Sequence, residues 1–143
     1  MELDYNSIMY TTDAVTKLFN KAKVATVTSM NGTNITLKLG NKAQSDNGIL
    51  KDYGSYSNLP AGETSTAPWE RSANGVIVVD RCGDIITGPT KIIIEDGFIK
   101  SIENNVHGIK LKKILEQVNK IDNSKNAFNL GEFGVGTNPF AKI

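Results

Sequence analysis

Two glutamates stand out because each lies in a segment of glycine, proline and small residues. Glu63 lies within NLPAGETSTAP (residues 58–68), and Glu132 lies within LGEFGVGTNP (residues 130–139). A glycine directly precedes each acid, and prolines fix backbone torsions on either side. Such a segment holds a carboxylate at a set position, as a metal ligand or a general base requires. The competing interpretation is two glutamates in ordinary surface loops, which often have this composition.

The other side chains that commonly do chemistry are scarce. His107 is the single histidine, and its position between a predicted strand and a predicted helix indicates a solvated turn residue. The single cysteine, Cys82, excludes an internal disulfide and fits a reducing cytosol. Zinc and cobalt hydrolases usually use several imidazole and carboxylate ligands. Because the chain has a single histidine, it cannot supply two imidazoles to one site. We assign no catalytic residue from the sequence.

The composition predicts a soluble, cytoplasmic single domain over residues 1–143. A chain of 143 residues is long enough to bury a hydrophobic core. The 16 basic and 15 acidic residues leave a net charge of +1, with no basic patch for nucleic acid. No apolar run has the length of a signal peptide core or a membrane span, so we expect no membrane partner.

The periodicity of apolar residues predicts an α+β fold. We expect a mixed or antiparallel sheet of about five to seven strands, bent or barrel-like, with two helices packed on it. Asn31-Gly32 and Asp96-Gly97 are strong signals for hairpin turns. Residues 1–10 show no clear period and are left open as an arm or a strand, and residues 40–58 read as a long loop. The expected helices cover residues 13–22 and 109–121, and the expected strands cover residues 23–30, 33–39, 64–66, 74–80, 90–95, 98–102 and 126–135.

The two glutamate segments and their order along the chain resemble the aminopeptidase T/S family, the thermophilic-type, leucyl-aminopeptidase-like metallopeptidases. The family pattern is roughly NLPxGEVFTAP, then a hairpin and a helix, then GEFGxGTNP. The resemblance extends from about Thr16 to the end of the chain. Thr64-Ser65 replace the usual Val-Phe, which removes apolar bulk beside Glu63.

This resemblance implies a metal site and a reaction. Glu63 and Glu132 match two glutamates that ligate metal in the family, with zinc, cobalt or manganese as the ion and a peptide as the substrate. In the family, two histidines and an aspartate follow the GTNP segment, and a separate α/β domain precedes the region matched here. The chain therefore resembles the central β-rich domain of a larger metallo-aminopeptidase, and we expect an incomplete metal site and little or no peptidase activity from this chain alone.

Two alternatives remain open at this point. A β-rich domain with a free sheet edge can act as a non-catalytic binding or oligomerisation module, for which a homodimer is the simplest assembly. A related branch of the superfamily comprises iron-dependent ring-cleaving dioxygenases, which also use histidine and carboxylate ligands. We rank that branch lower because of the missing histidines and because the GTNP segment points to the peptidase side.

Overall fold

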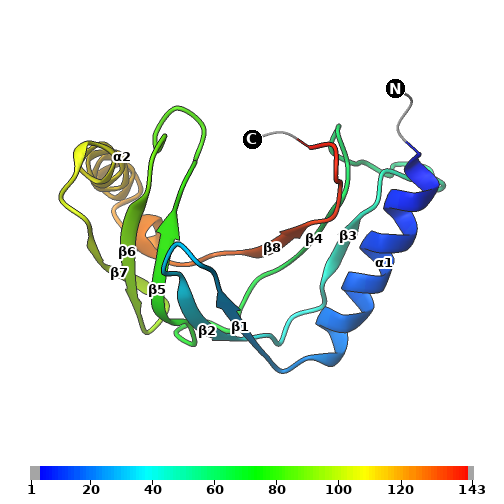
Figure 1. Ribbon diagram of the computed structural model, residues 1–143, viewed down its shortest axis with the longest axis horizontal. Helices are drawn as coiled ribbons and strands as arrows, with labels where there is room; N and C mark the ends of the chain where they lie inside the picture. The colour runs from blue at the N-terminus through cyan, green and yellow to red at the C-terminus, as the bar shows by residue number, and fades with distance from the viewer. Residues whose placement is uncertain (1–3, 142–143) are drawn as a thin grey trace. The chain divides into compact units, whose positions relative to one another are not determined.

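Two helices and two antiparallel sheets make up the part of the chain that the computed structural model describes, residues 4–141 (Figure 1). The predicted α+β class with two helices is confirmed. The eight strands form two open sheets of five and three strands, where we expected one bent sheet of five to seven. The chain divides into two compact units. The first comprises the chain up to Lys23, Leu39–Pro68 and the segment from Glu132, and the second comprises Val24–Lys38 and Trp69–Gly131.

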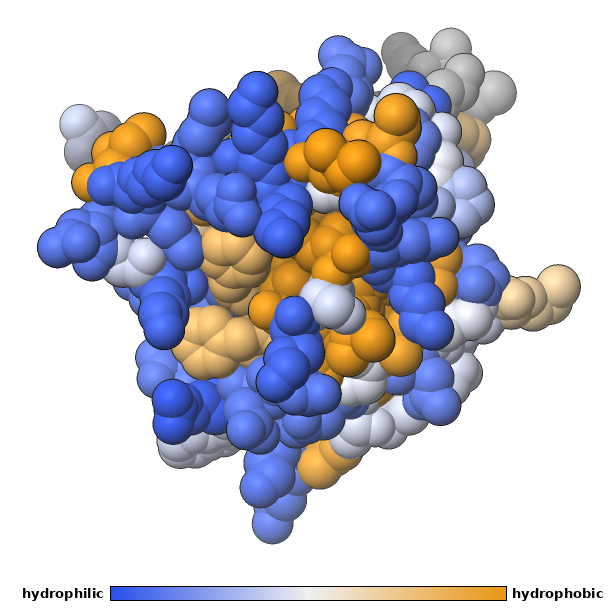
Figure 2. Space-filling view, turned by 90° about the vertical axis from the view of Figure 1, so that its left-hand side faces the viewer, coloured by the Kyte–Doolittle hydropathy of each residue, from blue (hydrophilic) through white to orange (hydrophobic). Residues whose placement is uncertain are grey.

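The second unit contains the five-stranded sheet, and a helix packs against two of its strands. The strand order is β1 (Val24–Thr28), β2 (Asn34–Lys38), β5 (Asn74–Val79), β6 (Thr90–Glu95), β7 (Phe98–Ile102). The helix α2 (Val106–Asp122) packs against β6 and β7, and the short 3-10 helix η1 (Asn126–Phe128) packs against α2. Figure 2 shows the side of the molecule where α2 and β7 lie. Alternation along β2 and β6 buries their inward side chains, so that Leu37 and Ile94 are each only 2% exposed.

Both predicted hairpin turns are present. Asp96 and Gly97 have φ 47° and 76°, which is the left-handed backbone that a two-residue turn between twisted strands requires. At the other turn Ser29 N donates a hydrogen bond to Thr33 O (3.1 Å), so the loop has three residues, of which Gly32 has the positive φ, 103°. The helix α2 begins three residues before its predicted start because the side chain of Asn105 accepts a hydrogen bond from Gly108 N (2.8 Å). His107 therefore lies half-buried in the first turn of α2, and its prediction as a solvated turn residue is wrong.

The first unit contains α1 (Tyr5–Lys21) and the three-stranded sheet, with the order β3 (Gln44–Asp46), β4 (Glu63–Thr66), β8 (Phe133–Gly136). The helix packs along β3 and β4, as Figure 1 shows. It begins much earlier than predicted because Asp4 caps it by accepting a hydrogen bond from Asn6 N (3.0 Å). The prediction of an arm or a strand over residues 1–10 is therefore wrong for the residues from Tyr5 on, and its first three residues lie outside the described part of the chain.

Two further boundaries differ from the predictions. The strand β3 lies inside the segment that we expected to be a loop, because its three residues pair with β4. The predicted strand over residues 126–135 is a strand only from Phe133 on. Its first part forms η1, where Asn119 Oδ1 accepts a hydrogen bond from Ala127 N (3.1 Å). Within residues 4–141, neither helix combines the length and the apolar character that crossing a bilayer requires.

Candidate functional site

The two glutamate segments are neighbouring strands of the first unit. β4 and β8 pair antiparallel, with Glu63 opposite Gly136 and Ser65 opposite Gly134. Glu63 is the first residue of β4 and Glu132 directly precedes β8. The sheet therefore brings together two acids that lie far apart in the sequence.

Both carboxylates converge on Gly134. A Cβ atom on this glycine would lie 2.5 Å from Glu63 Oε1 and 3.6 Å from Glu132 Oε1. Glu63 is half-buried and Glu132 is exposed. A side chain at position 134 would displace the Glu63 carboxylate, so the glycine leaves room for that carboxylate in its present position.

The two faces of the β4–β8 strand pair have different roles. Because side chains alternate along a strand, Glu63 and Gly134 share one face, while Thr64 and Phe133 lie on the opposite face. On that opposite face, Thr64 is fully buried and the ring of Phe133 stacks on Phe19 of α1, with centroids 5.1 Å apart. The hydrophobic face thus fixes the strands on the helix and leaves the carboxylate face open.

The GTNP segment clamps the chain immediately before Glu63. Thr137 N donates a hydrogen bond to Gly62 O (2.8 Å), and Asn138 Nδ2 donates one to Ala61 O (2.8 Å). Gly62 has φ 118°, and a Cβ atom on it would lie 2.6 Å from Asn138 Cβ. Only glycine satisfies both the torsion and the close approach. These motif residues position the acid, and none of them supplies a catalytic group by this arrangement.

A chain of threonine hydroxyls ties the strands to α1. Thr64 Oγ1 donates to Thr12 O (3.0 Å) and lies 2.8 Å from Thr16 Oγ1, while the hydroxyls of Thr12 and Thr137 are 2.7 Å apart. Thr64 brings less apolar bulk beside Glu63 than the valine of the family pattern, but its buried hydroxyl is hydrogen-bonded to α1. The sequence reasoning missed Thr12 and Thr16. The available signal was a pair of threonines four residues apart, of which only Thr16 falls in the predicted helix over residues 13–22.

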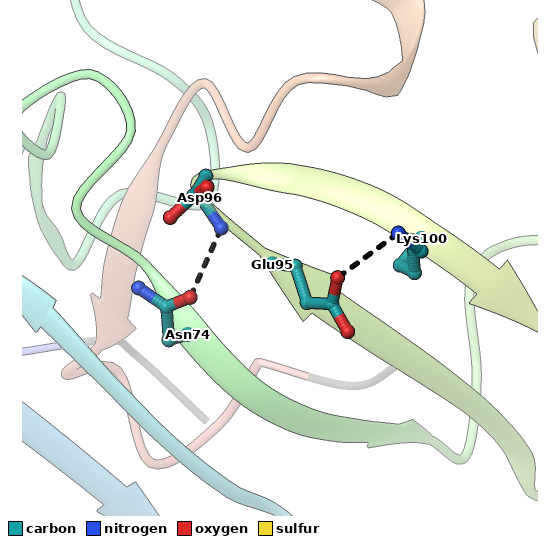
Figure 3. Close-up of polar contacts among 4 residues, drawn as sticks. All are labelled: Asn74, Glu95, Asp96 and Lys100. Atoms are coloured by element: carbon teal, nitrogen blue, oxygen red, sulfur yellow. Dashed lines mark hydrogen bonds and ion pairs between the residues drawn. The ribbon is translucent and has the colours of Figure 1, made fainter.

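Two acids of the second unit, Glu95 and Asp96, take part in contacts of the β6–β7 hairpin. In the second unit, Glu95 pairs with Lys100 across the β6–β7 hairpin, with Oε2 and Nζ 3.2 Å apart (Figure 3). At the tip of the same hairpin, Asp96 N donates a hydrogen bond to Asn74 Oδ1 (3.0 Å). These contacts hold the turn in place.

The donor set of the first unit fits part of a metal site. Carboxylate oxygens suit hard and borderline divalent ions. Among residues 4–141, no cluster of three or more histidine, cysteine, aspartate or glutamate side chains is present. An ion bound by Glu63 and Glu132 would have most of its coordination positions left for water or for other ligands.

Two solved structures share the fold of this chain. A 2,5-dihydroxypyridine dioxygenase from Pseudomonas putida KT2440 has a TM-score of 0.81 and 23% sequence identity, and the match covers 99% of this chain and 41% of that one. Wild-type AmpT from Thermus thermophilus has a TM-score of 0.70 and 20% identity, with 92% and 34% covered. At these identities the likeness establishes the fold. The chain spans less than half the length of either protein.

The family is established by the sequence. Residues 6–143 match the model of the NicX family, described as 2,5-dihydroxypyridine 5,6-dioxygenase. The chain belongs to this family. No curated protein matches the sequence.

The prediction of a hydrolase, namely a metallo-aminopeptidase, is therefore wrong, and the dioxygenase branch that we had ranked lower is favoured. The likeness to AmpT supports the resemblance to the aminopeptidase T/S family at the level of the fold. The physical reason for the error is that Gly62, Thr137 and Asn138 build the clamp between β4 and β8. A clamp holds carboxylates equally well for peptide hydrolysis and for oxygen chemistry, so these motifs do not distinguish the reactions.

Proposed function

We propose that this chain supplies two carboxylate ligands, Glu63 and Glu132, to the metal site of a dioxygenase that opens a hydroxylated nitrogen-containing aromatic ring. The observation that carries the metal role is the convergence of both carboxylates on Gly134. The reaction class rests on the family match over residues 6–143. The zinc, cobalt or manganese expected from the peptidase resemblance gives way to ferrous iron, because dioxygen chemistry favours a redox-active ion with open coordination positions.

The residues of this chain contribute position rather than reactivity. When bound, the ion would orient dioxygen and the hydroxylated ring for reaction with each other. The contacts of Gly62 and Asn138 fix the backbone position directly before Glu63. Gly134 has no side chain and therefore leaves room for the two carboxylates. An open face on one side of the sheet suits a flat aromatic substrate.

The metal role is tested by titrating the protein anaerobically with ferrous ion and, separately, with manganese(II), whose paramagnetism reports weak binding. We expect Glu63→Gln and Glu132→Gln each to weaken binding about tenfold or more, because each removes a charged ligand. Glu70→Gln is the matched control, since Glu70 is exposed and lies in the second unit. Equal binding by all four proteins would exclude the proposed ligands.

The reaction class is tested with 2,5-dihydroxypyridine and ferrous ion under air, following oxygen uptake and the loss of ring absorbance. We expect slow uptake by the wild-type chain, because two carboxylates leave much of the ion's coordination shell to water, and less uptake by Glu63→Gln. Oxygen uptake that is identical in the wild type and in this variant would contradict the assignment of the reaction to this site.

We propose in addition that the outer edge of β1 pairs with β1 of a second copy. Hydrogen bonds from Leu39 N to Lys23 O (2.9 Å) and from Ser29 N to Thr33 O (3.1 Å) define which residues of β1 face β2. By the antiparallel alternation, the even-numbered residues direct their backbone N–H and C=O groups to the free side. This edge carries no proline, charge or bulge that would block pairing.

An antiparallel pair of β1 strands is self-complementary. With Thr26 opposite its own copy, Val24 lies opposite Thr28, and every cross-strand pair within the strand is uncharged. Thr26→Pro removes one outward N–H and leaves the backbone hydrogen bonds to β2 in place, whereas Thr26→Val keeps that N–H. Both variants lose the hydrogen bond between Thr26 Oγ1 and Thr36 Oγ1 (3.0 Å), so the comparison between them isolates the outward N–H. We expect sedimentation velocity to detect a dimer for the wild type and Thr26→Val, and a monomer for Thr26→Pro. A wild-type monomer at high concentration would refute the proposal.

A further inference from the structure

The second unit carries a groove of about 520 Å³ beside the start of β7. Its lining combines three hydrophobic and three polar side chains, namely Phe98, Ile99, Phe128, Arg71, Asn119 and Lys125. On the side where α2 and β7 lie, Figure 2 shows an area of hydrophobic residues bordered by hydrophilic ones. The volume is within the range of roughly 300–1,000 Å³ that is typical of small-molecule sites.

The hydrophobic floor of the groove is held in place by backbone contacts. Phe98 forms an isolated bridge with Asn129, and Leu130 N donates a hydrogen bond to Gly97 O (2.8 Å). Asn119 Oδ1 fastens the start of η1 to α2 by accepting from Ala127 N (3.1 Å). The aromatic rings of Phe98 and Phe128 are therefore carried by segments that are tied to the sheet and to the helix.

The polar groups of the lining are hydrogen-bond donors. Arg71 and Lys125 are cations, and Asn119 has its oxygen engaged, which leaves its amide N–H groups. No carboxylate lines the groove. In the part of the chain that the structure describes, the ion pairs join Lys100 to Glu95 and Lys112 to Glu116, so neither cation of the groove is neutralised by a neighbour.

The position of Arg71 is set by its backbone. It has φ 61°, and the backbone of Arg71 approaches Gly97 so closely that a Cβ atom there would lie 2.9 Å from Arg71 N. The β6–β7 turn thus fixes the backbone of Arg71, whose side chain lines the groove. A planar guanidinium binds a carboxylate through two parallel hydrogen bonds.

We propose that this groove binds a small aromatic monocarboxylate. The ring lies on Phe98 and Phe128, and the carboxylate binds Arg71 and Lys125. The charge of the lining argues for this occupant, because an apolar floor with cations and no acid favours a ligand that is apolar at one end and anionic at the other. This site shares no residue with the Glu63–Glu132 pair, and it takes an anion where that pair takes a cation.

The probe is benzoate, with benzamide as its uncharged counterpart of nearly the same shape. In a titration followed by ¹H–¹⁵N correlation spectra, benzoate is expected to shift the resonances of Phe98, Asn119 and Phe128. Benzamide is expected to bind at least about tenfold more weakly, because a charge-assisted hydrogen bond is roughly twice as strong as a neutral one. Equal binding of the two probes, or shifts confined to other parts of the chain, would overturn the proposal.

The variants Arg71→Gln and Lys125→Gln are each expected to weaken benzoate binding several-fold and to leave benzamide binding unchanged. Lys112→Gln is the matched control, because Lys112 lies on the exposed side of α2 and pairs with Glu116. The same spectra show whether each variant is folded. Unchanged benzoate affinity in both groove variants would refute the site. The proposal would also be refuted if the groove bound a peptide with a C-terminal phenylalanine but did not bind benzoate.

Discussion

Gly134→Ala should impair the carboxylate pair while leaving the fold intact. The new Cβ atom would lie 2.5 Å from Glu63 Oε1, whereas ordinary contact begins at 3.4 Å. The Glu63 side chain must therefore move by roughly 1 Å to restore normal van der Waals contact. Gly134 does not have a positive φ, so the backbone itself accepts alanine without strain.

The size of the effect follows from the tolerance of metal ligands. Ligand distances in metal sites hold within about 0.2 Å, so a shift of this size removes Glu63 from its position. Changes that disturb the orientation of a ligand typically cost about 10- to 100-fold in metal affinity. The free energy of unfolding should stay the same or rise by about 0.4–1 kcal/mol, because alanine reduces the entropy of the unfolded chain.

Gly136→Ala is the matched control for this prediction. It lies on the same strand and the same face, but a Cβ atom there would meet no atom within 4 Å. Manganese(II) titration with paramagnetic line broadening measures the affinity, and urea unfolding measures the stability. If Gly134→Ala and Gly136→Ala bind the ion equally well, the geometry of the pair does not determine metal binding and the reasoning fails.

Three further substitutions test the supports of the site and the core. Thr64→Val keeps the shape of a fully buried side chain but removes the hydroxyl that lies against Thr16. Urea unfolding should show that the free energy of unfolding falls by about 1 kcal/mol. An unchanged unfolding midpoint would mean that this hydrogen bond does not stabilise the protein. Gly62→Ala should cost about 1–3 kcal/mol, because it forces a positive φ on alanine and a contact of 2.6 Å with Asn138 Cβ; a neutral result would mean that the clamp yields. Ile94→Ala, in the core of the five-stranded sheet, should cost about 2–5 kcal/mol by thermal or chemical unfolding, and a loss below 1 kcal/mol would show that this core is loosely packed.

Local features of the fold were predictable because they depend on neighbouring residues. The turns at Asn31-Gly32 and Asp96-Gly97 follow from residues that adopt left-handed backbone readily, and the strands beside them follow from alternation. The start of α1 was not predictable by the same means. Its first turns lack a clear apolar period. The start of the helix is set by the cap at Asp4 and by the packing of Ile8, which is 4% exposed.

The reaction class shows the limit of motif reasoning. The segments around Glu63 and Glu132 were correctly singled out as unusual, but the motif residues beside them serve the clamp between the two strands. Motifs of this kind identify a scaffold, and a scaffold is compatible with more than one chemistry. The match over almost the whole chain therefore outweighs the motifs.

By itself, the sequence determined the α+β class, the two hairpin turns and the two acids placed among glycines and prolines. These features depend on backbone torsions and side-chain alternation, which are encoded in adjacent residues. Only the tertiary structure decided that Glu63 and Glu132 converge on Gly134, and that the buried hydroxyl of Thr64 is hydrogen-bonded to α1. Both depend on which strands pair and which helix covers them, and that outcome results from burial across the whole unit rather than from any short stretch of sequence.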